Sequence, residues 1–423
     1  MIAGLDGFDC RPLDLAGFGA AQHETGFSVE AMADAVAAQI RTHDPDRWML
    51  VGHSMGGKIA TILAHRAEHG GRLPGLIGVV LLAASPPSAE PIDDDRRGAM
   101  LGWVDDGPIG EKDARDFIDQ NIAAALPSAA YDGAVADVKR ANPMAWRAWL
   151  ERGSREDWSD HVGTLQTPAL IIAGAEDGDL GEANQRALNM PHYAHARFES
   201  VAQAAHLIPL EQPEAVARLI REHVDAIGPA TVPADYARLI ASDRVSARTR
   251  TVLTGRAIAD DPDYEPQIVS VSQLATLRAL VDRVLPQSRI DLAARIDAHL
   301  AAGGGDGWRF AALPVDAEAY RLGLDTLDGL ADRQFAALKD EDRDALLHRI
   351  EAADWSADTP LTPDQMTLWF EDVRADAVRI WLAHPASMAR IGYDGFANGG
   401  DGVRKQGYAL TAADERERWE PAR

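Results

Sequence analysis

The first half of the chain alternates between short apolar runs and amphipathic stretches of helix length. The runs at residues 48–51, 76–82 and 168–174 are almost wholly apolar, which is typical of strands buried on both faces of a parallel sheet. Between such runs, apolar residues recur at helical spacing, as they do after the capping residue Ser28 at Val29, Met32, Ala33, Val36 and Ile40. The alternation predicts an α/β fold built on a parallel sheet.

Two further strands are expected at residues 9–15 and 196–201. A last helix of this half is expected from Pro213 through Val224, with proline in its first turn. The alternation is interrupted at residues 85–160, where prolines and an acidic run precede amphipathic stretches rich in tryptophan and isoleucine. We interpret residues 85–160 as a helical cap over the functional site, although an ordinary helical subdomain without a gating role fits the pattern equally well.

The second half has a different pattern. Residues 228–267 are irregular and rich in proline and threonine, which indicates a linker with room for one short helix. From residue 268 to residue 423 the apolar spacing is helical almost throughout, and its best-marked helix begins with Thr362 and Gln365 in a capping box. The sequence therefore predicts an α/β domain at residues 1–227 and a mostly α-helical domain at residues 268–423.

A Gly-x-Ser-x-Gly motif joins the strand at 48–51 to the helix that follows it. Ser54 lies at the tip of this sharp turn, where its hydroxyl is held clear of the sheet. We expect that a Cβ atom at Gly52 or Gly56 would collide with the neighbouring strand and helix. The backbone N–H of Met55, at the start of the helix, is the expected donor to a negative oxygen that develops during acyl transfer.

Asp177 and His206 each follow a later predicted strand, so the chain order is serine, aspartate, histidine. A serine hydroxyl is barely acidic, and an imidazole must take its proton during attack and return it to the leaving group. The imidazole needs a carboxylate that fixes its tautomer and steadies its charged form. The sequence predicts Ser54 as nucleophile, His206 as general base and then acid, and Asp177 as the orienting carboxylate.

Other titratable residues near these positions compete for the same roles. Asp179 is an alternative to Asp177, whereas Glu176 is expected to point away from the site. His192 and His195 precede a strand, where a surface or helix-end role is expected. No residue set in the second half indicates catalysis, and no metal site is predicted anywhere in the chain.

The length, charge and composition of the chain limit the classes of protein to which it can belong. A length of 423 residues exceeds one ordinary core, and a net charge of -24 argues against binding to nucleic acid or to anionic membranes. No apolar run approaches the roughly 18 residues that cross a bilayer, and Cys10 is the only cysteine. The first residues resemble no signal peptide, which indicates a cytoplasmic protein, or a periplasmic one if the native start lies upstream.

Residues 9 to about 226 resemble the α/β-hydrolase fold superfamily, of the esterase, lactonase and perhydrolase kind. The matching motifs are Asp14 to Gly19, the turn at Gly52 to Gly57, Gly174 to Asp177, and Ala205-His206 followed by Glu211 to Glu214. The serine at position 54 excludes the relatives that use an aspartate nucleophile. The resemblance implies hydrolysis of a small-molecule ester or lactone.

The N-terminus departs from that superfamily. Its members carry further upstream strands, one of which ends in a His-Gly loop that supplies a second oxyanion N–H, and residues 1–8 are too few to provide them. We expect either that the native protein begins upstream of Met1 or that the hydrolase domain is degraded, with half an oxyanion hole. The presence of all three predicted catalytic residues favours the first reading.

Residues 268 to about 410 resemble the gluconate 2-dehydrogenase subunit 3 family. The similarity lies in Arg283 to Pro286, Phe335 to Leu338, the helix of Trp369 and Phe370, and Ile391 to Gly395. Members are helical small subunits that accompany a separate flavin-containing dehydrogenase of sugars or polyols. The resemblance implies that this chain carries no cofactor and that FAD belongs to a partner subunit.

Together these features predict a fusion protein. The first domain is expected to hydrolyse a carboxylic ester or lactone through an acyl-enzyme on Ser54, and the second to dock a flavin-dependent dehydrogenase. The alternative is a non-catalytic assembly subunit of a GMC-type dehydrogenase complex, in which a degraded hydrolase domain is only a scaffold.

Overall fold

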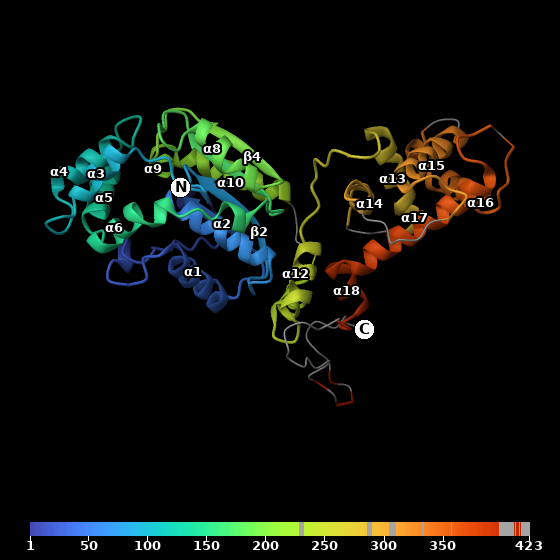
Figure 1. Cartoon of the computed structure of the whole chain (residues 1–423), viewed down its shortest axis with the longest axis horizontal. Coiled ribbons are helices and arrows are strands. Elements are labelled where there is room, and N and C mark those ends of the chain that lie inside the picture. Colours follow the sequence, from blue (N-terminus) through green and yellow to red (C-terminus); the bar gives the residue numbers. More distant parts are fainter. Residues whose placement is uncertain are drawn as a thin grey trace. The chain divides into compact units, whose positions relative to one another are not determined.

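The chain forms two compact units, Met1–Ala259 and Asp260–Asp394, the first of which also includes Gly395 and Phe396 (Figure 1). We call them the N-terminal unit and the C-terminal unit. The computed structural model describes residues 1–227, 232–285, 290–303, 310–331, 334–356, 358–396, 410, 412–413 and 415.

A parallel sheet lies at the centre of the N-terminal unit. Its strands follow the order β1-β2-β3-β4, and every neighbouring pair is parallel. The α/β fold that the sequence predicts is therefore confirmed. The strands are β1 (Trp48–His53), β2 (Leu76–Leu82), β3 (Ala169–Gly174) and β4 (Ala196–Val201).

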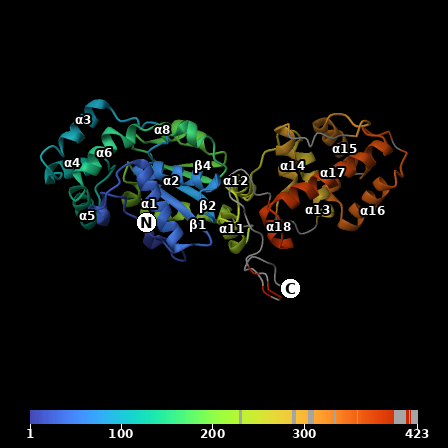
Figure 2. The same cartoon turned by 60° about the horizontal axis from the view of Figure 1, so that its bottom comes forward.

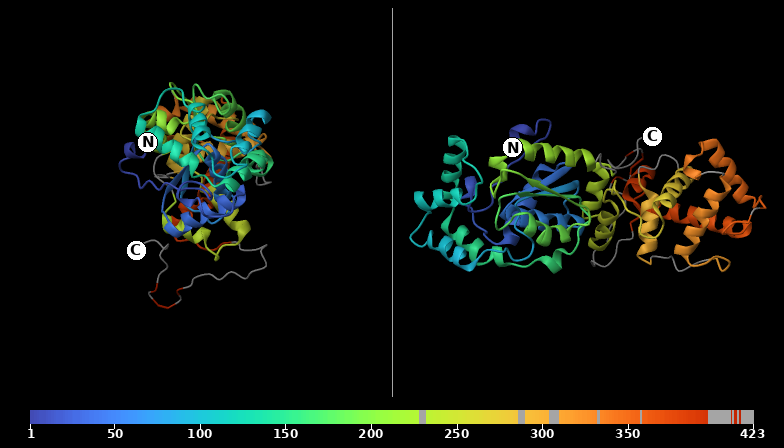
Figure 3. Two further views of the ribbon diagram at one scale, coloured as in Figure 1. Left: turned by 90° about the vertical axis from the view of Figure 1, so that its left-hand side faces the viewer. Right: turned by 90° about the horizontal axis from the view of Figure 1, so that it is seen from above.

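Helices cover both faces of this sheet, because alternate residues of the central strands point to opposite sides. Val80 and Leu82 pack with residues of α10 (Pro213–Ile227), whereas Val79 and Leu81 pack with residues of α2 (Met55–Glu68). Helix α1 (Val29–His43) packs on α2 (Figure 2), and in the right-hand view of Figure 3 the strands run between helices. The apolar runs of β2 and β3 are thus buried on both faces, whereas the run in β1 is only partly buried.

The strand predicted at residues 9–15 is wrong. These residues form no strand, and among the described strands β1 pairs only with β2. An extended segment becomes a strand only beside a hydrogen-bonding neighbour, and none of the described strands pairs with residues 9–15. The segment instead turns on itself, because the Asp14 carboxylate accepts the N–H of Ala20, and Val51 on β1 remains 41% exposed.

Four helices between β2 and β3 form a group with an apolar core of its own, at one end of the N-terminal unit (Figure 1). We call this group the cap. Its gating role stays a prediction. The cap helices are α3 (Asp94–Gly102), α4 (Glu111–Asp119), α5 (Ser128–Lys139) and α6 (Pro143–Glu151), and the short α7 (Ser159–Val162) leads back to the sheet.

Two helices occupy the segment that the sequence suggested as a linker with one short helix. They are α11 (Ala234–Ala241) and α12 (Ala247–Arg256), and residues 228–231 lie outside the described residues. Arg238 on α11 pairs with Asp44 at 2.9 Å, and Arg250 on α12 donates to the carbonyl of Gly70 at 3.0 Å. Both helices therefore belong to the N-terminal unit. Each is too short for its apolar spacing to stand out in the sequence.

The C-terminal unit is helical, as predicted, and has one core around the buried Trp369. The expected capping box of Thr362 and Gln365 is present, and Ser270 and Gln273 form another. Pro286 and most residues after 396 lie outside the described residues. The helices are α13 (Val271–Val284), α14 (Leu292–Ala301), α15 (Asp316–Leu330), α16 (Asp340–Glu351), α17 (Pro363–Ala383) and α18 (Pro385–Ile391).

No described helix combines the length and the apolar character that crossing a membrane requires.

Candidate active site

Ser54 lies in the turn between β1 and α2, with a backbone φ of +51°. A non-glycine residue rarely adopts a positive φ, and such strain persists only where the surroundings enforce it. Here the N–H of Ser54 donates to the carbonyl of Leu82 on β2 at 3.0 Å, and its carbonyl accepts from the N–H of Gly57 at 2.8 Å. The turn is thereby fastened to the sheet on one side and to α2 on the other.

The glycines around Ser54 differ in whether a Cβ atom would fit at their positions. A Cβ atom at Gly52 would lie 2.4 Å from the carbonyl oxygen of Gly56, so position 52 requires glycine. A Cβ atom at Gly56 would meet nothing within 4 Å, so the collision predicted there is wrong. The close approach occurs one residue later, where a Cβ atom at Gly57 would lie 2.2 Å from that of Ala84, because Gly57 faces the sheet.

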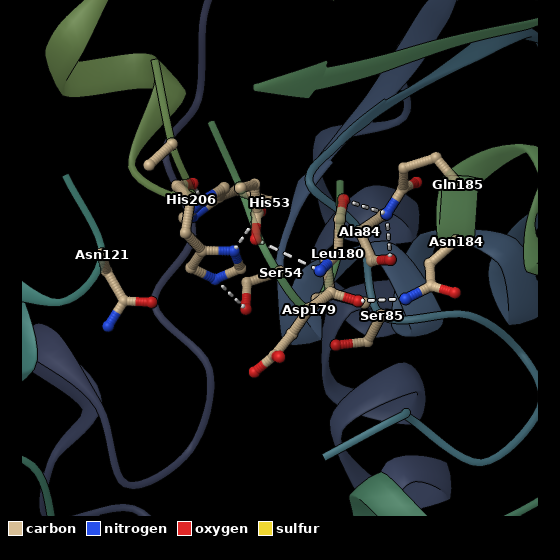
Figure 4. Close-up of polar contacts among 12 residues, drawn as sticks. His53, Ser54, Ala84, Ser85, Asn121, Asp179, Leu180, Asn184, Gln185 and His206 are labelled. Atoms are coloured by element: carbon tan, nitrogen blue, oxygen red, sulfur yellow. Dashed lines mark hydrogen bonds and ion pairs between the residues drawn. The ribbon is translucent and has the colours of Figure 1, made fainter. Parts of the chain in front are cut away.

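The three predicted catalytic side chains are joined by hydrogen bonds. The distance from His206 Nε2 to Ser54 Oγ is 2.9 Å (Figure 4), and that from His206 Nδ1 to Asp177 Oδ2 is 3.1 Å. The carboxylate only accepts, so this network assigns the proton to Nδ1 and leaves Nε2 to accept from the serine hydroxyl. Asp177 follows β3, and His206 follows β4 in the loop before α9 (Ile208–Glu211).

The surroundings of Asp177 keep its carboxylate ionised. Burial raises the pKa of Asp177, but the hydrogen bond and charge of His206, with the N–H of Leu180 at 3.2 Å, lower the pKa below its ordinary value. An ionised carboxylate beside Nδ1 stabilises the imidazolium that forms when His206 takes a proton. The electrostatics therefore favour His206 as an acceptor of the Ser54 proton.

The competing residues have other partners. Asp179 pairs with Arg96 of the cap, and Glu176 accepts the N–H groups of Gln203 and Ala204. His192 lies before β4, where its ring bonds the carbonyl of Gly163 at 2.9 Å, and His195 also precedes β4. Of the acidic candidates, Asp177 is the one that contacts His206.

His53, which occupies a variable position of the Gly-x-Ser-x-Gly motif, was not among the predicted site residues. Its Nε2–H donates to the backbone carbonyl of His206 at 2.8 Å, and the two rings lie 5.1 Å apart (Figure 4). Burial, and then the neighbouring His206, lower the pKa of His53 to about 4. His53 is therefore neutral at ordinary pH and supports the loop of His206.

Two further charged residues lie behind the turn. Lys58 on α2 is completely buried, and its ammonium donates to the carbonyls of Gly153 and Glu156, at 3.1 Å and 2.8 Å, where the chain leaves the cap. Glu90 accepts from the hydroxyl of Ser85 at 2.9 Å, and burial raises the pKa of its carboxyl. A lysine directly before the mostly apolar residues 59–64 was the signal that the sequence offered for the first of these contacts.

The backbone N–H of Met55 is the expected oxyanion donor. Met55 is the first residue of α2, so its N–H belongs to the positive end of a helix, and its role stays a prediction. Among the described residues, no group of three or more histidine, cysteine, aspartate or glutamate side chains is arranged to hold a metal ion.

Two family models match separate parts of the chain. The family model described as Alpha/beta hydrolase family matches residues 2–219, which are 218 of the 423 residues. The chain belongs to this family. The model described as Gluconate 2-dehydrogenase subunit 3 matches residues 271–398 of the same hydrolase-family chain.

Individual relatives are more distant. The chain is 29% identical over 230 residues to a pimeloyl-[acyl-carrier protein] methyl ester esterase of Neisseria meningitidis, which covers 51% of this chain and 82% of that protein. It is 28% identical over 217 residues to a 2-succinyl-6-hydroxy-2,4-cyclohexadiene-1-carboxylate synthase of Serratia proteamaculans. This match covers 49% of this chain and 80% of that protein. Among solved structures, an esterase from Exiguobacterium antarcticum is 19% identical with a TM-score of 0.43. This match covers 50% of this chain and 80% of the esterase. The hydrolase-family membership therefore comes with esterase homologues.

The two glycines of the turn give a matched test. Gly52→Ala forces a Cβ atom against the Gly56 carbonyl and is expected to lower the free energy of unfolding by about 2 kcal/mol or more. Gly56→Ala places a better helix former in open space and is expected to change stability by less than about 1 kcal/mol. Denaturant unfolding of both variants checks this. Equal destabilisation by the two substitutions contradicts the geometry.

The lowered pKa of His53 predicts a pH dependence of stability. An unfolded histidine binds a proton near its ordinary pKa of 6.5, whereas folded His53 does so only near 4. The unfolded state therefore binds more protons in this window, and stability contributed by neutral His53 is lost as pH falls from about 6.5 towards 4.

The variant His53→Gln separates the contribution of His53 to the pH dependence of stability from that of the other histidines. Glutamine keeps a donor for the His206 carbonyl but does not titrate. Thermal melting between about pH 7 and about pH 4.5 is expected to shift less in His53→Gln than in the wild type. An identical shift in both proteins contradicts the assignment. His65 and His223, whose pKa values are also lowered to about 4, are common to both proteins.

Proposed function

We propose that the N-terminal unit is a serine hydrolase that cleaves a carboxylic ester or a lactone through an acyl-enzyme on Ser54. The observation that carries the proposal is the chain of hydrogen bonds from Ser54 Oγ through His206 to Asp177. This arrangement has the three parts that acyl transfer needs, namely a hydroxyl nucleophile, a base and a carboxylate that orients the base.

In the proposed first half-reaction, Ser54 Oγ attacks the carbonyl carbon of the substrate while its proton passes to His206 Nε2. The Met55 N–H, at the N-terminus of α2, would stabilise the negative oxygen of the tetrahedral intermediate. The intermediate collapses when the bond from carbon to the alcohol oxygen breaks, and His206 gives its proton to that oxygen. Ser54 then carries the acyl group.

In the second half-reaction, water replaces the alcohol. His206 takes a proton from the water, whose oxygen attacks the acyl carbon, and then returns the proton to Ser54 Oγ as the acid leaves. For a lactone, the alcohol and the acid are parts of one molecule, so the product is a hydroxy acid. The esterase homologues support ester hydrolysis, whereas lactone hydrolysis and perhydrolysis by the same Ser54 are finer proposals.

The C-terminal unit is proposed to dock a separate flavin-dependent dehydrogenase that holds the FAD. The support is its match to the gluconate 2-dehydrogenase subunit 3 family over residues 271–398. The two activities are chemically compatible, because oxidation of a cyclic sugar at its anomeric carbon yields a lactone, which a hydrolase opens. The second candidate, a non-catalytic assembly subunit, is favoured by the same family match.

Hydrolysis by purified full-length protein tests the first proposal. With p-nitrophenyl acetate and with a sugar lactone as substrates, Ser54→Ala is expected to lower kcat/KM by about a thousandfold or more, and Asp177→Asn by a similar order. Asp179→Asn is the control for the acid and is expected to lose less than about tenfold. The proposal is wrong if wild type and Ser54→Ala hydrolyse both substrates at the same rate.

Affinity purification of the full chain tests the docking proposal and separates the two candidates. The complex recovered from native cells is expected to contain a flavoprotein whose absorbance bleaches when a sugar or polyol is added. A recovered flavoprotein together with no ester or lactone turnover supports the assembly subunit. Recovery of turnover without any flavoprotein contradicts the docking role and leaves the hydrolase.

A further inference from the structure

The loop that carries His206 is held through its backbone at three successive residues. The N–H of Ala205 donates to Glu211 Oε2 at 2.8 Å, and the carbonyl of His206 accepts from His53. The N–H of Leu207 donates to the carbonyl of Asn121 at 3.1 Å. Asn121 belongs to the cap loop between α4 and α5, and Figure 4 shows its side chain on the far side of His206 from Asp179. The loop of His206 is therefore tied to the cap as well as to the sheet.

Glu211 extends this connection, because its two oxygens bond different parts of the unit. Oε2 accepts the N–H of Ala205, next to His206, while Oε1 accepts the N–H of Ala123 in the cap loop at 2.5 Å. Hydrogen bonds to an ionised carboxylate are about twice as strong as those between neutral groups. One carboxylate on α9 thus joins two backbone segments that lie far apart in the sequence.

We propose that Glu211 is a positioning residue that couples the cap loop to the backbone of His206. A shift of the cap loop moves the Glu211 carboxylate, and with it the N–H of Ala205 and the imidazole next to it. Because a misplacement of about 1 Å in an active site can cost about a hundredfold in rate, the position of the cap would control the reactivity of Ser54 through Glu211. The kinetic part rests on the proposed function, whereas the structural coupling does not.

Glu176 provides the matched comparison. Its carboxylate also holds the His206 loop, through the N–H groups of Gln203 and Ala204 at 3.3 Å and 3.0 Å, but both of these donors belong to that loop and not to the cap. A role limited to supporting the loop predicts the same consequences for Glu176→Gln and Glu211→Gln. Coupling to the cap predicts that only Glu211→Gln loosens both segments.

Hydrogen–deuterium exchange of the full-length protein measures the coupling without any turnover. Glu211→Gln removes one acceptor oxygen and is expected to speed exchange in both residues 118–127 and residues 202–207. Glu176→Gln is expected to speed exchange in residues 202–207 alone.

Ala123→Pro, which removes the cap donor, is expected to speed exchange at residues 202–207. Ala124→Pro is its control, because no hydrogen bond of the Ala124 N–H is found within the described residues. The coupling is overturned if Ala123→Pro and Ala124→Pro leave residues 202–207 equally protected.

Kinetics measure what the coupling does. Glu211→Gln is expected to lower kcat by about tenfold to a hundredfold while KM changes little, since the substrate still binds but His206 is misplaced. Ala123→Pro is expected to lower kcat in the same way, and the double variant to lose little more, because both changes break one connection. Additive losses, or a loss in KM alone, contradict the positioning role. An inactive wild type contradicts the proposed function instead, and exchange still decides the coupling.

Discussion

The contact between Ser54 Oγ and His206 Nε2 is the interaction on which the rest of the N-terminal unit depends. It exists because parallel strands β1 and β4, at opposite edges of the sheet, bring their carboxyl ends to the same side of the domain. The positive φ of Ser54 aims its hydroxyl at the imidazole, and Gly52 leaves room for that turn. A backbone strained in this way is stable only because the sheet and α2 hold it from both sides.

The cap is joined to this centre by polar contacts that differ in kind. Lys58 bonds carbonyls at the end of the cap, Arg96 pairs with Asp179 beside the orienting carboxylate, and Glu211 bridges the cap loop and the loop of His206. Each contact connects the cap to one element that carries a catalytic side chain. Hydrogen bonds and an ion pair therefore connect the cap to the elements that carry the catalytic residues.

The parts of this structure that the sequence predicted share a local signal. Ser54 lies in a recognisable turn, Asp177 follows an apolar strand, His206 follows the last predicted strand, and the long helices of the C-terminal unit have caps and helical spacing. The failures depend on distant neighbours. Residues 9–15 contain Pro12 and two aspartates and pair with none of the described strands, and the clash at Gly57 instead of Gly56 depends on which glycine of α2 faces Ala84.

Contacts made by backbone groups have no sequence signal at all. The N–H of Ala123 that bonds Glu211 is available at any non-proline residue, so only the fold reveals that it lies beside the catalytic loop. The role of His53 could not be predicted for the same reason, because its partner is a backbone carbonyl 153 residues away in the sequence. The sequence allowed one short helix where α11 and α12 lie, because their attachment near α1 and α2 relies on a few arginine and threonine contacts rather than on a long apolar face.

The most direct test of the central claim is covalent labelling of the full-length protein with a fluorophosphonate, followed by mass measurement of the intact chain and its peptides. A serine activated by His206 is expected to take up one adduct, located on Ser54, and labelling of His206→Ala is expected to be slower by about a thousandfold or more. A wild type that forms no adduct, or that reacts no faster than His206→Ala, would contradict the account.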